Sequence, residues 1–69
     1  MVDNISKKLG QKIRKIRENK GLSQEKVALE ANLNRAYIGY IERGERNPSI
    51  KTVSKIAKVL KTPLYELFR

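Results

Sequence analysis

Apolar residues recur at helical spacing along most of the chain. In the first segment Ile5, Leu9, Ile13 and Ile16 are separated by four, four and three residues, and lysines and arginines lie mostly between them. Such spacings place side chains on one face of an α-helix. β-Branched residues nowhere alternate with polar ones over five or more positions. The pattern therefore predicts an all-α protein.

Turn-forming residues end the first two helical segments. Gly21 is suited to the left-handed conformation that ends many helices, and Ser23 stands where a side-chain oxygen caps the next helix. That helix is predicted from Gln24 to about Ala31. Asn32 ends it, because asparagine is among the few non-glycine residues that tolerate a positive φ. The residues expected to face inward are Val27, Ala28 and Ala31.

Asn34 is a favourable cap for a third helix, from Arg35 to about Arg43, which breaks at Gly44. Ser49 caps a fourth helix, whose core stripe is Val53, Ile56, Ala57 and Leu60. A fifth short helix follows, with Thr62 as its cap and Pro63 at its first position. Its apolar residues are Leu64, Leu67 and Phe68. The chain thus reads as five helices.

The third helix has an unusual outward face. Ile38 and Ile41 define its core direction, and at about 100° per residue the positions away from it can be assigned. Ala36 and Arg43 point outward, Gly39 and Tyr40 lie near that direction, and Arg35, Tyr37 and Glu42 lie on the flanks. A glycine inside a helix costs about 1 kcal/mol against alanine. Close approach of a nucleic-acid groove would compensate for Gly39, and tight packing within the protein is the alternative.

Charge points to a polyanionic partner. The 69 residues are enough for one domain, 1–69, and carry 16 Lys and Arg against 7 Asp and Glu, a net charge of +9. Histidine and cysteine are absent, which removes the commonest general base, thiolate chemistry, disulfides and zinc sites built on those ligands. We expect no enzyme activity, no cofactor, no catalytic residue and no metal site.

The chain shows no membrane or secretory signal. No apolar run approaches the length of a span, and residues 1–10 lack the apolar region of a signal peptide, so we expect a cytoplasmic protein. Because neither disulfides nor metal ions cross-link so short a chain, added stability is expected from a partner subunit. This favours a dimer.

Several consecutive motifs carry a family resemblance. Gln24-Glu25-Lys26-Val27-Ala28, Asn32-Leu33-Asn34-Arg35 and Ile38-Gly39-Tyr40-Ile41-Glu42-Arg43-Gly44 together resemble the helix-turn-helix of phage repressors and Cro-like proteins. The resemblance covers about residues 5–68. It implies a compact five-helix lambda-repressor-like DNA-binding domain, with the helix-turn-helix at about residues 24–43 and helices four and five at about 49–68.

The stretch from Leu33 to Gly39, with that from Ile41 to Asn47, looks most like the controller proteins of restriction–modification systems. The resemblance implies a transcriptional regulator, repressor or activator, that binds a palindromic operator in double-stranded DNA as a homodimer. Its third helix would lie in the major groove.

The resemblance also implies roles for individual residues. Base reading falls to Arg35, Ala36, Gly39 and Tyr40, of which Arg35 is the best suited because a guanidinium can donate two bonds to guanine. Controller proteins often have a hydroxyl residue where this chain has Ala36 and a small polar one where it has Gly39. Contacts to the DNA backbone are implied for Gln24, Asn34, Tyr37, Arg43, Arg46, Asn47 and Ser49. An ion pair of Arg17 with Glu42 would brace the first helix against the third.

Leu64, Tyr65 and Phe68 are the predicted dimer interface, because so short a fifth helix cannot bury all three. The alternative is that Leu64 and Phe68 close the monomer core and Tyr65 stays half exposed. Contact of Glu25 and Glu30 with RNA polymerase is a further possible partnership, although helix capping and solvent exposure explain both residues.

Other functions remain open at this stage. A non-specific nucleic-acid or RNA-binding module would need only the charge. An antitoxin or phage accessory protein that acts through protein binding usually carries an added segment, whereas this chain ends at Arg69 directly after the fifth helix. Binding to a membrane surface through the first helix is disfavoured, because that helix lacks aromatic anchors.

Overall fold

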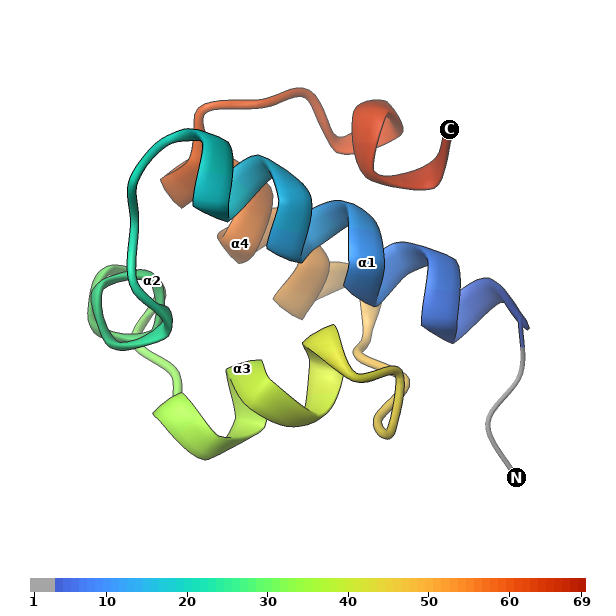
Figure 1. Ribbon diagram of the computed structural model, residues 1–69, viewed down its shortest axis with the longest axis horizontal. Coiled ribbons are helices and arrows are strands. Elements are labelled where there is room, and N and C mark those ends of the chain that lie inside the picture. Colours follow the sequence, from blue (N-terminus) through green and yellow to red (C-terminus); the bar gives the residue numbers. More distant parts are fainter. Residues whose placement is uncertain (1–3) are drawn as a thin grey trace.

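The computed structural model describes residues 4–69, which form four α-helices and one 3₁₀-helix in chain order (Figure 1). These are α1 (Asn4–Asn19), α2 (Gln24–Ala31), α3 (Arg35–Glu42), α4 (Ile50–Leu60) and η1 (Leu64–Phe68). The all-α prediction is confirmed, and the predicted helix-turn-helix corresponds to α2 and α3. The first three residues of the predicted domain, 1–3, lie outside the described residues.

The prediction of five α-helices is wrong for the last segment. Leu64–Phe68 is a 3₁₀-helix of 5 residues. Its first turn is closed by the Glu66 amide donating to the Pro63 carbonyl over 3.0 Å, a bond between residues three apart. The residue that precedes the helix is Pro63, not Thr62, and no side chain caps it. So short a segment cannot build the successive i to i+4 bonds of an α-helix.

The helix ends follow local rules. Ser23 Oγ accepts from the Lys26 amide, Asn34 Oδ1 from the Ala36 amide and Ser49 Oγ from the Thr52 amide. Gly21 and Asn32 adopt the left-handed conformation, as their residue types indicated. Lys61 does so too, with φ of 53°, although nothing in its side chain favours it. Three of the four predicted caps are thus confirmed, and one left-handed turn is unexpected.

Inward-facing residues from α1 to η1 meet in a single core. Its members are Leu9, Ile13, Val27, Ala28, Ile38, Ile41, Val53, Ile56, Ala57, Leu60 and Leu67. Ile5 was expected on the core stripe of α1 but is 71% exposed. The reason is positional, because the N-terminal end of α1 projects past the other helices (Figure 1).

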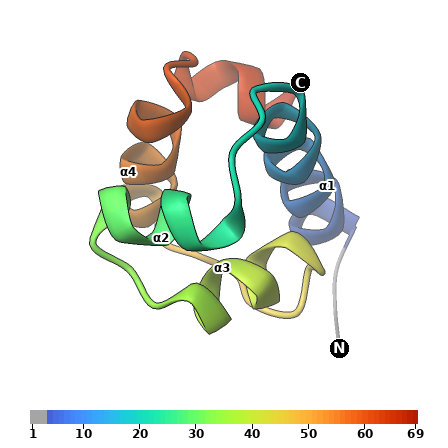
Figure 2. The same cartoon turned by 60° about the vertical axis from the view of Figure 1, so that its left-hand side comes forward.

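The helices are arranged so that α3 lies at one side of the molecule and η1 at the opposite side (Figures 1 and 2). α3 packs against α1 and α2, and η1 packs against α1 and α4. Among residues 4–69, no helix combines the length and apolar composition needed to cross a bilayer.

Gly10 lets α1 and α3 touch through their main chains. A Cβ added at Gly10 would lie 2.2 Å from the carbonyl oxygen of Ile41 and 2.7 Å from that of Glu42. These distances leave no room for any side chain. The backbone of α1 therefore sets the position of the C-terminal end of α3.

Candidate nucleic-acid interface

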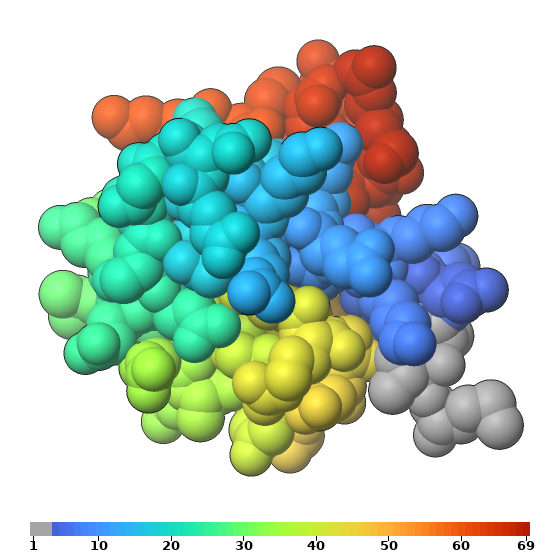
Figure 3. Space-filling view, viewed as in Figure 1, coloured from blue at the N-terminus to red at the C-terminus, as the bar shows by residue number. Residues whose placement is uncertain are grey.

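The outward side of α3 and the loop after it form an edge of the molecule, visible as the yellow-green and yellow surface at the bottom of Figure 3. Arg35 and Ala36 are exposed at the start of α3, and Tyr40 is 38% exposed one turn later. Ile38 and Ile41 are buried on the opposite side of the same helix. Three of the four predicted base-reading residues are therefore accessible to a ligand.

Gly39 departs from the prediction. It is buried, although the helical geometry directs it outward. A Cβ placed there would lie 3.1 Å from Nη1 of Arg43, so the guanidinium of Arg43 occupies the space in front of Gly39. The expectation of an open surface at Gly39 is wrong. A helical wheel gives only the direction of each residue and does not show that the Arg43 side chain, one turn later, folds back over Gly39.

Arg43, predicted to contact the DNA backbone, is part of a small cluster. Its Cζ lies 5.2 Å from the centre of the Tyr40 ring, and Cζ of Arg46 lies 5.3 Å from the same centre. Both distances are within the range of cation–π attraction. Nε of Arg43 also forms an ion pair with Oε2 of Glu45 over 3.2 Å. Two cations therefore lie against the Tyr40 ring, and one of them is paired with a carboxylate.

The other residues predicted to contact the DNA backbone are placed as follows. Arg46, Asn47 and Ser49 are exposed on the loop that leads into α4, and Asn34 is exposed at the start of α3. Tyr37 is half-buried and packs against the core, as a flank position allows. The last of the set, Gln24, has an intramolecular partner, because its Nε2 donates to Oε1 of Glu42 over 3.0 Å.

Glu42 is the centre of a buried hydrogen-bond network. Arg17 donates from Nε to Oε2 over 2.6 Å and from Nη2 to Oε1 over 3.0 Å, and its Nη1 donates to the Leu22 carbonyl over 2.7 Å. The Glu42 side chain is only 2% exposed. The hydrogen bond to Glu42 raises the pKa of Arg17 above its ordinary value. The implied ion pair is therefore present, and it ties α3 to α1 and to the turn before α2.

The predicted dimer residues differ in their surroundings. Tyr65 is 63% exposed and Phe68 is 49% exposed, whereas Leu64 is half-buried and packs against the core. Ile5 from α1 and Phe68 line the same hollow on this side of the molecule. Leu64 thus fits the alternative in which it closes the monomer core. The exposed apolar surface on this side consists of Tyr65, Phe68 and Ile5.

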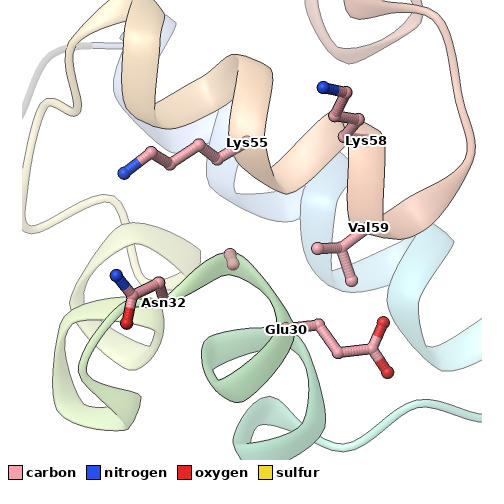
Figure 4. A pocket seen from close by; sticks show the side chains of 6 residues that line it. Glu30, Asn32, Lys55, Lys58 and Val59 are labelled. Carbon is pink, nitrogen blue, oxygen red and sulfur yellow. The ribbon is translucent and has the colours of Figure 1, made fainter.

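A second hollow, of about 480 Å³, lies between the C-terminal end of α2 and the middle of α4 (Figure 4). Its lining residues are Glu30, Ala31, Asn32, Lys55, Lys58 and Val59, and none of them belongs to α3. Among residues 4–69, no group of three or more His, Cys, Asp or Glu side chains is placed to hold a metal ion.

Comparison with known proteins identifies the family. Residues 13–67 match the family described as Helix-turn-helix, which is most of the chain. The chain belongs to the helix-turn-helix family. It is a DNA-binding regulator of transcription, as its sequence indicated.

Relatives within the helix-turn-helix family include control proteins. Control protein C.BamHI of Bacillus amyloliquefaciens is 51% identical over 61 residues, which are 87% of this chain and 75% of that protein. Control protein C.MunI of Mycoplasma sp is 40% identical and covers 97% of this chain and 92% of its own. The crystal structure of the restriction-modification controller protein C.AhdI from Aeromonas hydrophila matches with a TM-score of 0.89 at 44% identity, over 91% of this chain and 96% of that one.

Proposed function

We propose that this regulator reads a palindromic operator as a homodimer and acts as a restriction–modification controller protein. The observation that carries the proposal is the exposure of Arg35 and Ala36 at the start of α3 and of Arg46 and Asn47 on the loop that follows its other end. The similarity to C.BamHI and C.AhdI supports the controller role.

We infer two kinds of contact with DNA. Residues at the start of a recognition helix reach base edges, and arginine suits guanine because its guanidinium can donate two parallel bonds. Arg46, Asn47 and Ser49 lie on the loop and at the start of α4, where amide groups and cations favour phosphates. Phosphate contacts fix affinity and register, whereas base contacts fix sequence.

The dimer is proposed from the side of the molecule opposite α3. Tyr65 and Phe68 expose aromatic surface there, and Ile5 adds an aliphatic side chain. A twofold interface that includes these residues and keeps both copies of α3 on one side of the dimer would present both recognition helices to one duplex. Half-sites would then lie roughly 10 base pairs apart, one helical turn.

Selection of bound duplexes from a random pool, followed by mass measurement of the complex, tests site, symmetry and stoichiometry together. We expect a twofold-symmetric site with two chains bound. Equal affinity for selected and random duplexes at fixed salt would contradict the proposal, because charge alone would then explain binding.

Point substitutions test the division of roles. Arg35→Ala is expected to weaken the selected site by about 1–3 kcal/mol and to relax preference at one base position in each half-site. Arg46→Ala is expected to weaken all sequences similarly and to flatten the salt dependence. Arg14→Ala is the matched control, because Arg14 is an exposed arginine on α1, from which no residue is predicted to contact DNA. Indistinguishable effects of the first two changes would refute the division.

A further inference from the structure

The burial of Gly39 has an unusual cause. Nη1 of Arg43 lies 3.1 Å from the position of a Cβ at residue 39, and Cζ and Nη2 both lie 3.8 Å from it. The whole guanidinium therefore rests over the glycine. Because the contact involves the outward side of α3, the group presented at this position is the guanidinium of Arg43.

Three neighbours define the position of that guanidinium. Gly39 lies beneath it, the Tyr40 ring lies beside it, and Oε2 of Glu45 is 3.2 Å from its Nε. Among residues 4–69, no other carboxylate forms an ion pair with Arg43. Glu45 engages the Nε edge, so the two terminal nitrogens remain as the planar pair of donors that suits guanine O6 and N7.

The same carboxylate works against binding to DNA in general. Glu45 is exposed in the loop that contains Arg46, where phosphates are expected, and a negative charge there repels a polyanion. An exposed ion pair contributes little to folding stability. The physical consequences of Glu45 are therefore the orientation of Arg43 and the reduction of attraction to phosphates of any sequence.

We propose that Glu45 is a specificity-determining residue, which holds Arg43 over Gly39 as an oriented base-reading donor and prevents it from binding the nearest phosphate. The inference rests on the proposed operator recognition and adds Arg43 to the residues that read bases. Specificity is a difference between two affinities, so a group that lowers the affinity for random DNA more than that for the operator increases it.

Glu45→Gln tests this directly. Affinities for the selected operator and for a random duplex of equal length are measured by fluorescence anisotropy over a series of salt concentrations. We expect binding to random duplex to tighten about threefold to fivefold, with a salt slope steeper by about 0.9, as one added phosphate contact requires. Affinity for the operator should change less, so the ratio of the two affinities should fall.

Glu30→Gln is the matched control. It makes the same change in net charge and removes an exposed ion pair of the same kind, that of Glu30 with Lys26 at 3.0 Å on α2. We expect it to leave the affinity ratio unchanged. Arg43→Lys keeps the charge but removes the planar donors, and should lower the ratio with the salt slope retained. Melting curves followed by circular dichroism should show all three variants folded.

The inference would be overturned if Glu45→Gln left the ratio of operator affinity to random-duplex affinity unchanged, or changed it only as much as Glu30→Gln does. Glu45 would then act only through net charge. An unchanged ratio in Arg43→Lys would also overturn it. Failure of the proposed function is a separate result, since the wild-type protein would itself show no preference for any selected duplex.

Discussion

Removal of the Glu42 carboxylate should be among the most damaging single changes to the fold. Glu42 is 2% exposed and accepts three hydrogen bonds, two from Arg17 and one from Gln24, and the Arg17 side chain is itself only 10% exposed. Glu42→Ala would leave the buried guanidinium with only the carboxylate of Glu18, 3.9 Å away and 54% exposed, as a counter-charge. Loss of one partner of a buried ion pair costs about 3–5 kcal/mol.

That loss is large for a chain of this length. At about 0.05–0.15 kcal/mol per residue, a domain of 69 residues has roughly 3.5–10 kcal/mol of stability in total. Thermal unfolding followed by circular dichroism should therefore show a midpoint at least about 12 °C lower, since each kcal/mol shifts a small domain by about 4–8 °C. Glu30→Ala is the control, because Glu30 forms an exposed pair with Lys26 that is worth about 0–1 kcal/mol.

A double variant keeps the test decisive if Glu42→Ala does not fold. Replacement of both charges, as in Arg17→Met with Glu42→Leu, removes the uncompensated cation and should recover most of the lost stability. A loss below about 1 kcal/mol in Glu42→Ala would refute this reasoning, because the pair would then behave as an exposed one. A double variant no more stable than Glu42→Ala would refute it equally.

The pH dependence of this pair has a definite sign. The hydrogen bond to Glu42 raises the folded-state pKa of Arg17, so the stabilisation is complete below the ordinary arginine pKa and is lost only as pH rises through the raised value. Between about pH 6 and 9, the ionisation of Arg17 should therefore cause no change in melting temperature.

Substitutions at three further positions test local features. Gly10→Ala should lose about 1–3 kcal/mol in thermal unfolding, despite a gain of about 1 kcal/mol in helix propensity, because its Cβ would meet the Ile41 carbonyl. A more stable variant would contradict the close backbone contact. Lys61→Gly should gain about 0.5–1 kcal/mol, since glycine adopts the left-handed conformation without strain, and a loss in urea unfolding would argue against it. Asn34→Ala should lose about 1 kcal/mol by the same assay through its cap, and Asn34→Gly much less.

Features that depend on neighbours in sequence could be predicted. The caps at Ser23, Asn34 and Ser49 each involve a bond to an amide two or three residues away, so their signals are local. The core positions of α2 and α4 follow in the same way from helical spacing. The pairing of Arg17 with Glu42 joins residues 25 apart, and only the family resemblance indicated it.

Features that depend on tertiary contact could not be predicted in this way. Ile5 fits the apolar stripe of α1, yet it is 71% exposed. Gly39 is outward by its angle, yet Arg43 folds over it. The close contact at Gly10 was not predicted, although a glycine inside a helix and next to its apolar stripe can indicate close helix packing. The left-handed turn at Lys61 has no signal in its residue type.

The main-chain contact at Gly10 has a consequence for how new binding preferences can arise. Because carbonyl groups and a buried charge pair hold α3 in place, its exposed residues contribute little to maintaining its position. Arg35, Ala36 and Tyr40 can therefore be exchanged with small effects on stability, while the frame that presents them stays the same. Such a separation lets one scaffold acquire many DNA specificities through a few surface substitutions.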